Sequence, residues 1–287
     1  MIHALPHRRI AAAVLGLGVV SAAPAAALNL FSAQQDVELG RRAAADAERQ
    51  LPMVRDGNVE GYVNAIVRRL AAAAPGPRFS YRARVVDAAD INAFALPGGY
   101  VYVNRGLIRA VRSEAELAGV IAHEMAHVAE RHGTEQVSKA YGAQLGVGLL
   151  AQVLGGKDNR LGLGEQLVGS LGLNALFMKF SRDSENEADR VGARMMARAG
   201  YDPLAMASFF DLLAAQRRSN PGAVAQFFSS HPAPANRSAN IRAYARQLGG
   251  GDGGTVGSLR TVQSRLDRMP AARRQSALRT SSLRARR

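Results

Sequence analysis

The segment His123-Glu124-Met125-Ala126-His127 limits what this chain can fold into more than any other part of the sequence. In a helix, residues four apart lie on the same face, so His123 and His127 can reach one ion together. Glu124 projects in an adjacent direction, from which its carboxylate can touch a water held by that ion. Neutral imidazole is a natural Zn²⁺ ligand, and a catalytic zinc site takes three protein ligands and leaves one position open for water. The pattern predicts two metal ligands and a general base on one helix, and a third ligand elsewhere.

The sequence around this motif, within the stretch 113–133, predicts a helix that starts at a capping box. Ser113 and Glu116 form an S-x-x-E capping box, and apolar residues follow them at helical spacing. A five-residue motif can also arise by chance, and two histidines on one helix are often only surface residues. Here, however, His123 and Glu124 interrupt an apolar run, where a polar group without a partner is costly. That interruption favours a metal site.

The third ligand is expected in an E-x-x-x-D motif near the start of a helix predicted over residues 181–199. Glu185 and Asp189 are four residues apart and share a face, whereas Glu187 points elsewhere. Glu185 is therefore the candidate third ligand, and Asp189 is a carboxylate that can orient a ligand histidine through its free N–H. The alternative is an acidic first turn stabilised by the helix dipole, which accounts for Glu185 but not for Asp189.

The composition restricts the remaining chemistry. The 287 residues, 47% of them hydrophobic, suffice for one large core, or for one core with a small appendage. The absence of cysteine excludes disulfides, thiol nucleophiles and Cys-ligated zinc, so a metal must be held by histidine and carboxylate. The formal net charge of +14 allows binding to nucleic acid or to an anionic membrane surface. Because tryptophan is absent and aromatics make up only 6%, base stacking is disfavoured.

The first 27 residues resemble an export signal. Arg8 and Arg9 supply the basic start, residues 10–20 form an apolar core, and a small-residue A-x-A site follows. The apolar run is too short for a comfortable transmembrane helix, although an uncleaved membrane anchor is the alternative. We therefore expect a signal peptide over 1–27, a mature chain that starts near Leu28, and a periplasmic location.

The rest of the pattern alternates between helices and a small sheet, which indicates an α+β fold that is mainly α. Helical periodicity predicts four further helices, at residues 33–50, 59–74, from 202 onward, and 238–248. Residues 79–85 alternate apolar and polar as a half-exposed strand does. Two short extended runs, 92–96 and 100–103, flank Pro97-Gly98-Gly99 and predict a hairpin.

This hairpin leads directly into the predicted metal helix, so an edge of the sheet can lie beside the metal. The candidate edge strand is Asn92-Ala93-Phe94-Ala95-Leu96. An exposed edge there lets a peptide substrate add as another strand. On the pattern alone, a hairpin that merely covers the core is equally consistent.

Two other stretches have unusual composition. Residues 141–156 and 161–177 are Gly-rich and apolar, and each is near a membrane-spanning length, but Gln and Glu interrupt them. They predict a helical hairpin that is loosely packed because of its glycines. This hairpin could be a mobile lid or an element that touches the membrane. The alternative is a pair of buried core helices. Residues 249–287 are Gly- and Arg-rich and predict a largely disordered basic tail, with a short helix possible at 256–266.

Taken together, these motifs resemble those of a known peptidase family. H-E-x-x-H followed by E-x-x-x-D is the signature of the gluzincin peptidases related to the CAAX prenyl protease and the mitochondrial Oma protease. Their soluble periplasmic branch includes the beta-barrel assembly-enhancing protease. The resemblance covers roughly residues 35–248. It rests on Asn92 to Gly99, Val103 to Leu107, His123 to His127, Ser181 to Asp189, and Ser229 to Pro232 with Arg237.

The resemblance implies a helical, minigluzincin-like zinc-peptidase domain over 28–248, whose small sheet lines the active site with the edge strand 92–96. It implies one Zn²⁺ per chain. The implied ligands are His123, His127 and Glu185, and the implied general base is Glu124.

The resemblance also assigns roles to two residues near the end of the domain. By itself, a lone loop histidine such as His231 is usually a surface residue. In the periplasmic relatives, the matching histidine can occupy the open position on zinc and hold the enzyme latent. Arg237 matches a basic residue near the site that assists the substrate or the oxyanion.

We therefore expect a zinc-dependent endopeptidase that acts in envelope protein quality control. Its substrates would be misfolded or unassembled polypeptides, and peripheral contact of the enzyme with the membrane is possible. From the length of the segment after residue 248, we expect no tetratricopeptide docking array of the kind that many relatives carry. The alternative from another class is a zinc-containing periplasmic chaperone or assembly factor with little proteolysis, because closed four-ligand zinc sites are typically structural. A nucleic-acid-binding protein is opposed by the export signal.

Overall fold

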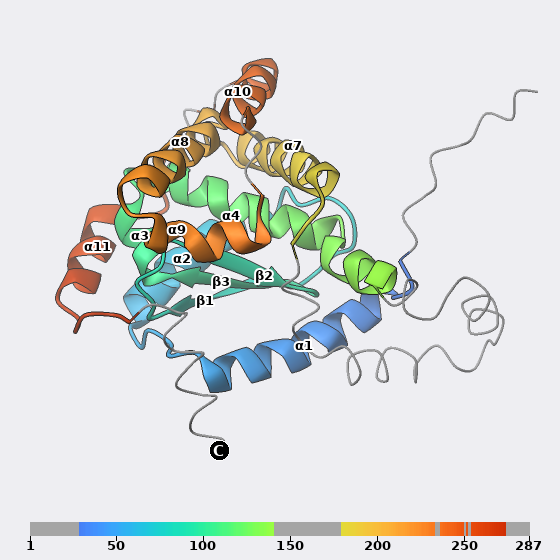
Figure 1. The fold of residues 1–287 in the computed structure, drawn as a ribbon, viewed down its shortest axis with the longest axis horizontal. Helices are drawn as coiled ribbons and strands as arrows, with labels where there is room; N and C mark the ends of the chain where they lie inside the picture. Colours follow the sequence, from blue (N-terminus) through green and yellow to red (C-terminus); the bar gives the residue numbers. More distant parts are fainter. Residues whose placement is uncertain (1–28, 141–178, 233–235, 250, 252–253, 274–287) are drawn as a thin grey trace, which may run out of the picture.

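The computed structural model describes residues 29–140, 179–232, 236–249, 251 and 254–273. Within these residues, helices surround one three-stranded sheet (Figure 1), so the predicted α+β, mainly α class is confirmed. The helices and strands, in chain order, are α1 (Ala33–Gln50), α2 (Gly57–Ala71), β1 (Arg82–Val86), β2 (Ala93–Leu96), β3 (Tyr100–Asn104), α3 (Arg105–Ala110), α4 (Glu114–Ala129), α7 (Arg182–Arg198), α8 (Leu204–Ser219), α9 (Pro221–Ser230), α10 (Arg237–Leu248) and α11 (Leu259–Asp267).

The sheet has the strand order β1-β3-β2. The predicted hairpin is confirmed, because β2 pairs with β3 in antiparallel register, with Phe94 opposite Tyr102. The predicted strand at 79–85 begins later, at Arg82, and pairs in parallel with β3. Strand β2 is therefore an edge of the described sheet, and α4 packs beside it.

The two faces of the sheet bury different clusters of side chains. Along β3, Val101 and Val103 belong to the large core that α2, α4, α7 and α8 also enter. Tyr100 and Tyr102 point the other way, into a smaller cluster covered by α1. Figure 1 shows the same layering, with α1 on one side of the sheet and α4 on the other. This period-two alternation is what a strand buried on both faces requires.

Helix α1 is held against the hairpin turn by a close backbone approach. A Cβ placed on Gly40 would lie 1.7 Å from the carbonyl oxygen of Pro97. Gly98 and Gly99 in that turn have φ of 77° and 105°, values that residues with a Cβ rarely adopt. Glycine at these positions therefore fixes how α1 meets the edge strand.

Helix α4 is buried on all its faces, as a helix in the middle of a core must be. At its start, Ser113 Oγ accepts from the N–H of Glu116 at 3.1 Å. The second half of the predicted capping box is wrong, because the Glu116 carboxylate accepts from the N–H of Arg112 instead, at 2.8 Å. The helix ends at Ala129, and Arg131, with φ of 61°, reverses the chain just after it.

The segment around His231 is more helical than its description as a loop suggests. Ser229 and Ser230 belong to α9, which the pattern did not predict, and Arg237 is the first residue of α10. Helix α9 spans 10 residues and buries only Val224 and Phe227, which is too little for a clear periodicity.

Part of the Gly- and Arg-rich segment after residue 248 packs on the domain. The helix that was possible at 256–266 is present as α11, which contacts α2 and α3. Its Val262 and Leu266 are buried, and Arg265 forms an ion pair of 2.9 Å with Asp56, the N-cap of α2. The Arg265 guanidinium holds the pKa of Asp56 below its usual value.

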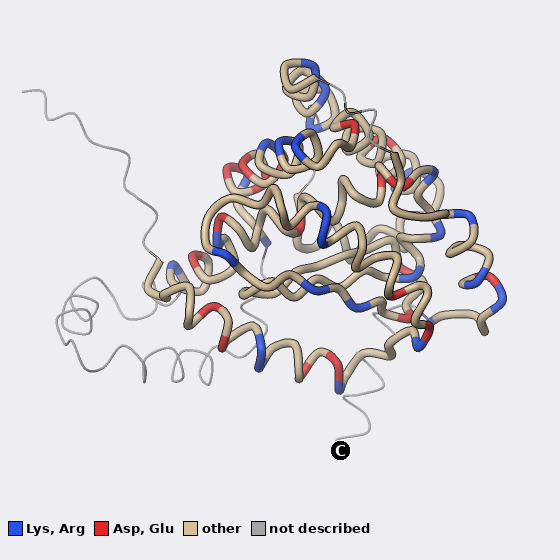
Figure 2. The backbone as a smooth tube through the Cα atoms, turned by 180° about the vertical axis from the view of Figure 1, so that it is seen from behind, with Lys and Arg blue, Asp and Glu red and all other residues tan. Residues whose placement is uncertain are grey.

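Some sequence predictions lie outside the described residues. These are the export signal at 1–27, the Gly-rich runs at 141–156 and 161–177, and the end of the tail. Among the helices that are described, none combines the length and apolar character needed to cross a bilayer. Figure 2 shows that the described helices carry Lys and Arg interspersed with Asp and Glu. Arg109 and Asp267 form one exposed ion pair of this kind.

Leu266→Ala should show whether α11 is an integral part of the fold. The side chain is fully buried, so its truncation should lower the free energy of unfolding by about 2–5 kcal/mol. Urea unfolding followed by circular dichroism measures this change. Leu204→Ala is the matched control, because that leucine is exposed and its loss should cost less than about 0.5 kcal/mol. Equal effects at the two positions would contradict the assignment of α11 to the core.

Candidate metal centre

The close packing of α7 on α4 brings the two sequence motifs together. A Cβ placed on Gly192 of α7 would lie 3.1 Å from the carbonyl carbon of Ala122 and from the nitrogen of His123 in α4. Glycine at this position thus lets the two backbones approach closely. As a result, the acidic start of α7 lies over the histidines of α4.

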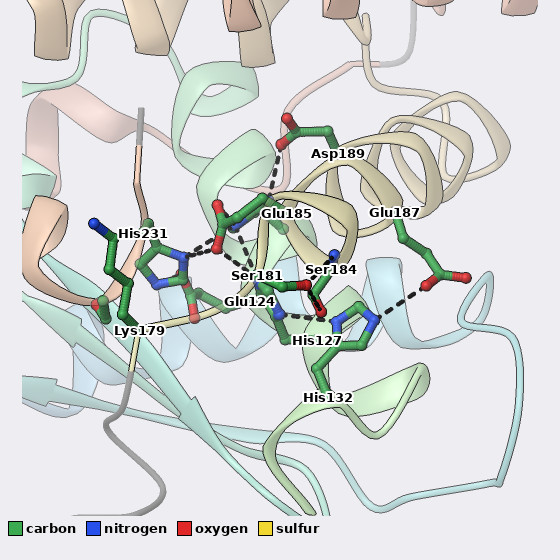
Figure 3. A network of polar contacts seen from close by, with 12 residues as sticks. Glu124, His127, His132, Lys179, Ser181, Ser184, Glu185, Glu187, Asp189 and His231 are labelled. Atoms are coloured by element: carbon green, nitrogen blue, oxygen red, sulfur yellow. Dashed lines mark hydrogen bonds and ion pairs between the residues drawn. The ribbon is translucent and has the colours of Figure 1, made fainter. Parts of the chain in front are cut away.

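Four predicted site residues form one buried cluster, whose ligand atoms lie within 4.8 Å of one another. They are His123, His127, Glu185 and His231. The Nε2 atoms of His123 and His127 are 3.1 Å apart, and His231 Nδ1 lies 3.3 Å from His123 Nε2. Glu185 Oε1 is 2.9 Å from His231 Nδ1 and 3.5 Å from His127 Nε2. Figure 3 shows Glu185 and His231 converging beside His127.

The arrangement of protons around this cluster fits a bound cation. His123 Nδ1 lies 3.0 Å from Asp189 Oδ1, so the N–H of a neutral His123 faces that carboxylate and its Nε2 carries a bare lone pair. His127 Nδ1 faces the side chain of His132. With the proton of His127 on Nδ1, its Nε2 also carries an unprotonated lone pair. These two lone pairs are 3.1 Å apart and repel each other. Arg237 Nη2 lies 3.1 Å from Nε2 of His123, and a metal ion would accept both lone pairs.

Burial and neighbouring charges set the protonation of the group. Burial lowers the pKa of His127 well below its usual value, which keeps the imidazole neutral, as a metal ligand must be. Burial alone would raise the pKa of Glu185, but attraction to His231 and the hydrogen bond from His231 hold it far below the usual range. Both ligand types are thus in the form that binds metal.

Arg237 connects two of the carboxylates. Its Nη1 lies 2.8 Å from Glu185 Oε2, and its Nε and Nη2 each donate to Asp189 at 2.7 Å. The guanidinium is buried, and burial lowers its pKa less than Asp189 and Glu185 raise it. Arg237 therefore lies at the site as predicted, but it is engaged by two carboxylates. Its predicted role toward the substrate or the oxyanion stays a prediction.

Glu124 faces the same space from the adjacent direction, as its position in the motif predicts. Its side chain is buried, and Oε1 lies 3.4 Å from His231 Nε2. Burial raises the pKa of Glu124 above that of an exposed glutamate. A carboxyl group with a raised pKa, aimed at a metal cluster, is suited to accept and return a proton near neutral pH.

His231 lies between Glu124 and the other ligands. It is the C-cap of α9, it is buried, and its ring stacks on Phe227 with centroids 4.9 Å apart. Burial would lower the pKa of His231, but the carboxylates of Glu124 and Glu185 raise it. A buried histidine that contacts His123 and Glu185 is part of the site and not a surface residue.

Three residues next to the cluster were missed by the sequence patterns. The ring of Phe180 stacks on His127 with centroids 4.0 Å apart, and its N–H donates to the carbonyl of Ser230 at 3.0 Å. His132 contacts His127, and Glu187, which was assigned no role, contacts His132. No helical spacing could have identified His132, because the chain reverses at Arg131 just before it.

The predicted substrate strand lies beside the cluster. Ala95, Leu96 and Pro97 line one narrow pocket together with His127 and Phe180. The described part of the chain places no strand on the outer edge of β2. An extended peptide on that edge would thus pass close to the metal cluster.

Comparisons with known proteins agree with this geometry. The profile of peptidase family M48 matches residues 58–245. The beta-barrel assembly-enhancing protease of Yersinia pestis is 31% identical over 229 residues, which cover 76% of this chain and 45% of that protein. The protein of the same name from Escherichia coli K12 is 30% identical, over 77% of this chain and 46% of its own.

Another relative is a mitochondrial protein. The mitochondrial metalloendopeptidase OMA1 of Schizosaccharomyces pombe is 32% identical over 190 residues, which are 66% of this chain and 53% of that protein. The chain thus spans about half the length of the curated relatives that it matches.

Arg237→Leu should destabilise the metal-free protein strongly. The substitution leaves the buried carboxylates of Glu185 and Asp189 without their cation, so the free energy of unfolding should fall by about 3–5 kcal/mol. Urea unfolding in the presence of a chelator measures it. Arg242→Leu on the same helix is the control, because Arg242 pairs with Asp211 at the surface and should contribute less than about 1 kcal/mol. A similar small effect for both would show that Arg237 is not needed to balance the carboxylates.

Proposed function

The chain belongs to peptidase family M48, and from that premise we propose that it is a zinc-dependent endopeptidase. In this proposal one Zn²⁺ is held by His123, His127 and Glu185, and Glu124 is the general base. The observation that carries it is the convergence of those three ligand atoms, with the Glu124 carboxylate facing the same point.

The spacing of the ligand atoms supports zinc as the metal. Four ligands at about 2.0–2.1 Å from a tetrahedral zinc lie about 3.3–3.4 Å from one another. The distances between His123 Nε2 and His127 Nε2, and between His127 Nε2 and Glu185 Oε1, are 3.1 and 3.5 Å. The donors are nitrogen and oxygen without sulfur, as in the peptidase sites of the H-E-x-x-H type.

Each protein group then has a defined task. Zinc, when bound, supplies a Lewis acid for the scissile carbonyl and brings the pKa of water toward neutrality. Glu124 removes the proton of the attacking water and delivers it to the leaving amine nitrogen. Asp189 holds the N–H of His123 and so keeps its Nε2 directed at the metal. The outer edge of β2, with Asn92 to Leu96, holds the substrate backbone in an extended conformation.

His231 makes the site latent in this proposal. It adds a fourth donor to the three ligands and lies between them and Glu124. While it is there, water and substrate are excluded from the position that catalysis needs. Activation then requires that His231 leave the cluster and that substrate take its place.

We place this activity in the periplasm, in the control of envelope protein quality. The support is the predicted signal peptide over 1–27 and the name of the bacterial relatives, beta-barrel assembly-enhancing protease. The substrates would be misfolded or unassembled envelope and outer-membrane polypeptides. The peptidase domain would comprise residues 28–248, followed by a basic tail, 249–287, that can touch an anionic membrane surface.

One observation favours a second candidate, a chaperone with structural zinc. His231 completes a four-donor set, and closed four-ligand sites are typical of structural zinc. The two candidates differ in what happens when Glu124 or His231 is changed.

Glu124→Gln should abolish cleavage and leave metal binding intact. The amide cannot accept the water's proton, so hydrolysis of casein should fall by a factor of about 10²–10⁴. Zinc measured by atomic absorption should stay at one per chain, because Glu124 is not a ligand in this proposal. Glu130→Gln, at the end of the same helix, is the control and should cleave at the parent rate. Unchanged cleavage in Glu124→Gln would rule out this mechanism.

His231→Ala should raise the rate of casein cleavage and keep zinc bound. If His231 occupies the site in 90–99% of molecules, its removal should increase the rate about 10- to 100-fold. Ser229→Ala, an exposed position in the last turn of α9, is the control for general disturbance of this segment. Stoichiometric zinc without cleavage by any variant would instead favour the structural-zinc chaperone.

A further inference from the structure

Behind the ligand His127 lies a second histidine that the proposed mechanism does not use. His132 is 3% exposed, and its Nδ1 lies 2.9 Å from Nδ1 of His127, with the rings inclined at 71°. On the far side, His132 Nε2 lies 3.2 Å from Glu187 Oε2. Figure 3 shows the three side chains in a row, from His127 through His132 to Glu187.

The position of His132 is built into the fold. The chain reverses at Arg131, with φ of 61°, so that His132 turns back toward α4. The Arg131 guanidinium donates to the buried carboxylate of Asp36 at 2.6 and 3.1 Å, and to the carbonyl of Phe31. The bend is therefore anchored to α1, and the imidazole of His132 has little freedom to move away.

The hydrogen bonds of this row can run in only one direction. The carboxylate of Glu187 accepts only, so Nε2 of His132 carries the proton and donates. Nδ1 of the neutral His132 is then bare and accepts from Nδ1–H of His127. With its proton on Nδ1, His127 presents the lone pair of Nε2 to the metal cluster.

Each of the two proposed histidine ligands thus has its own outer partner, and one short stretch of α7 supplies a carboxylate behind each of them. Glu185 is itself a ligand, and Asp189 fixes the tautomer of His123. Glu187 lies between them in sequence and reaches His127 only through His132. The side chain of Glu187 is 56% exposed, so solvent weakens its charge, and His132 should matter more than Glu187.

We propose that His132 is a positioning residue that fixes the tautomer and ring orientation of His127, with Glu187 as the outer end of the hydrogen-bonded row. This inference rests on the proposed function only in taking His127 as a metal ligand. Outer hydrogen-bond partners of this kind typically contribute a factor of 10–100 in metal affinity.

The zinc dissociation constant tests this proposal directly. It is measured at one pH by competition with a chromogenic chelator, using the full chain. His132→Leu fills similar space but cannot accept a hydrogen bond, so the dissociation constant should rise about 10- to 100-fold. His132→Asn places an amide oxygen where Nδ1 was and should recover most of that loss. Glu187→Gln should change it only a few-fold, and Asp183→Asn, an exposed carboxylate in the first turn of α7, not at all.

A spectrum separates positioning from packing. With Co²⁺ in place of zinc, the visible absorption bands should shift or weaken in His132→Leu and return in His132→Asn, because they report the ligand field at the metal. A role limited to filling space predicts parent-like bands and affinity for His132→Leu and no advantage for His132→Asn. That result would overturn the proposal.

Two further comparisons keep the outcomes distinct. If His132→Leu does not fold, His132→Asn is compared with His132→Gln, whose amide lies toward Glu187 and not toward His127. Tighter zinc binding by His132→Asn supports the proposal, and equal binding contradicts it.

A parent protein that binds zinc but cleaves nothing would contradict the proposed function while the affinity series still decides the role of His132. A parent that binds no zinc would overturn both.

Discussion

The packing of α7 against α4 is the contact on which the rest of the site depends. Close approach at Gly192 lets the acidic start of α7 reach the two histidines of α4. It also gathers charge in the core, because Glu124, Glu185 and Asp189 are buried near a single cation, Arg237. Arg237 balances only part of that negative charge, and a divalent cation at the cluster would offset the rest. The charge balance and the converging lone pairs thus lead to the same conclusion about a metal.

The elements that close the site are connected to one another. His231 follows α9, and the carbonyl of the residue before it, Ser230, accepts the N–H of Phe180, whose ring stacks on His127. The segment that enters α7 and the segment that leaves α9 therefore cover the cluster as a pair. In the proposed mechanism, a movement of His231 away from the ligands also breaks or strains the contact at Phe180, so the energy that keeps the site latent is shared by both segments.

Much of the local structure followed from sequence patterns. Helix α1 has the predicted bounds Ala33–Gln50, and Ser181 caps α7 at the predicted start. The hairpin of β2 and β3 lies around Pro97-Gly98-Gly99 as its turn residues indicate. These features depend on contacts between residues two to four apart, which periodicity and capping rules describe directly. The choice of His123, His127 and Glu185 as one cluster also followed from such spacing within each motif.

The tertiary structure alone decided the features that join distant segments. The parallel pairing of β1 with β3 and the contact of His132 with His127 depend on where the chain turns. Arg237 bridges two carboxylates from another helix, and no spacing in the sequence records that contact. The sequence by itself determined which residue types were available for metal chemistry and which of them share a helix face. Packing then decided which partners surround each ligand, because burial and charge balance arise only when separate elements meet.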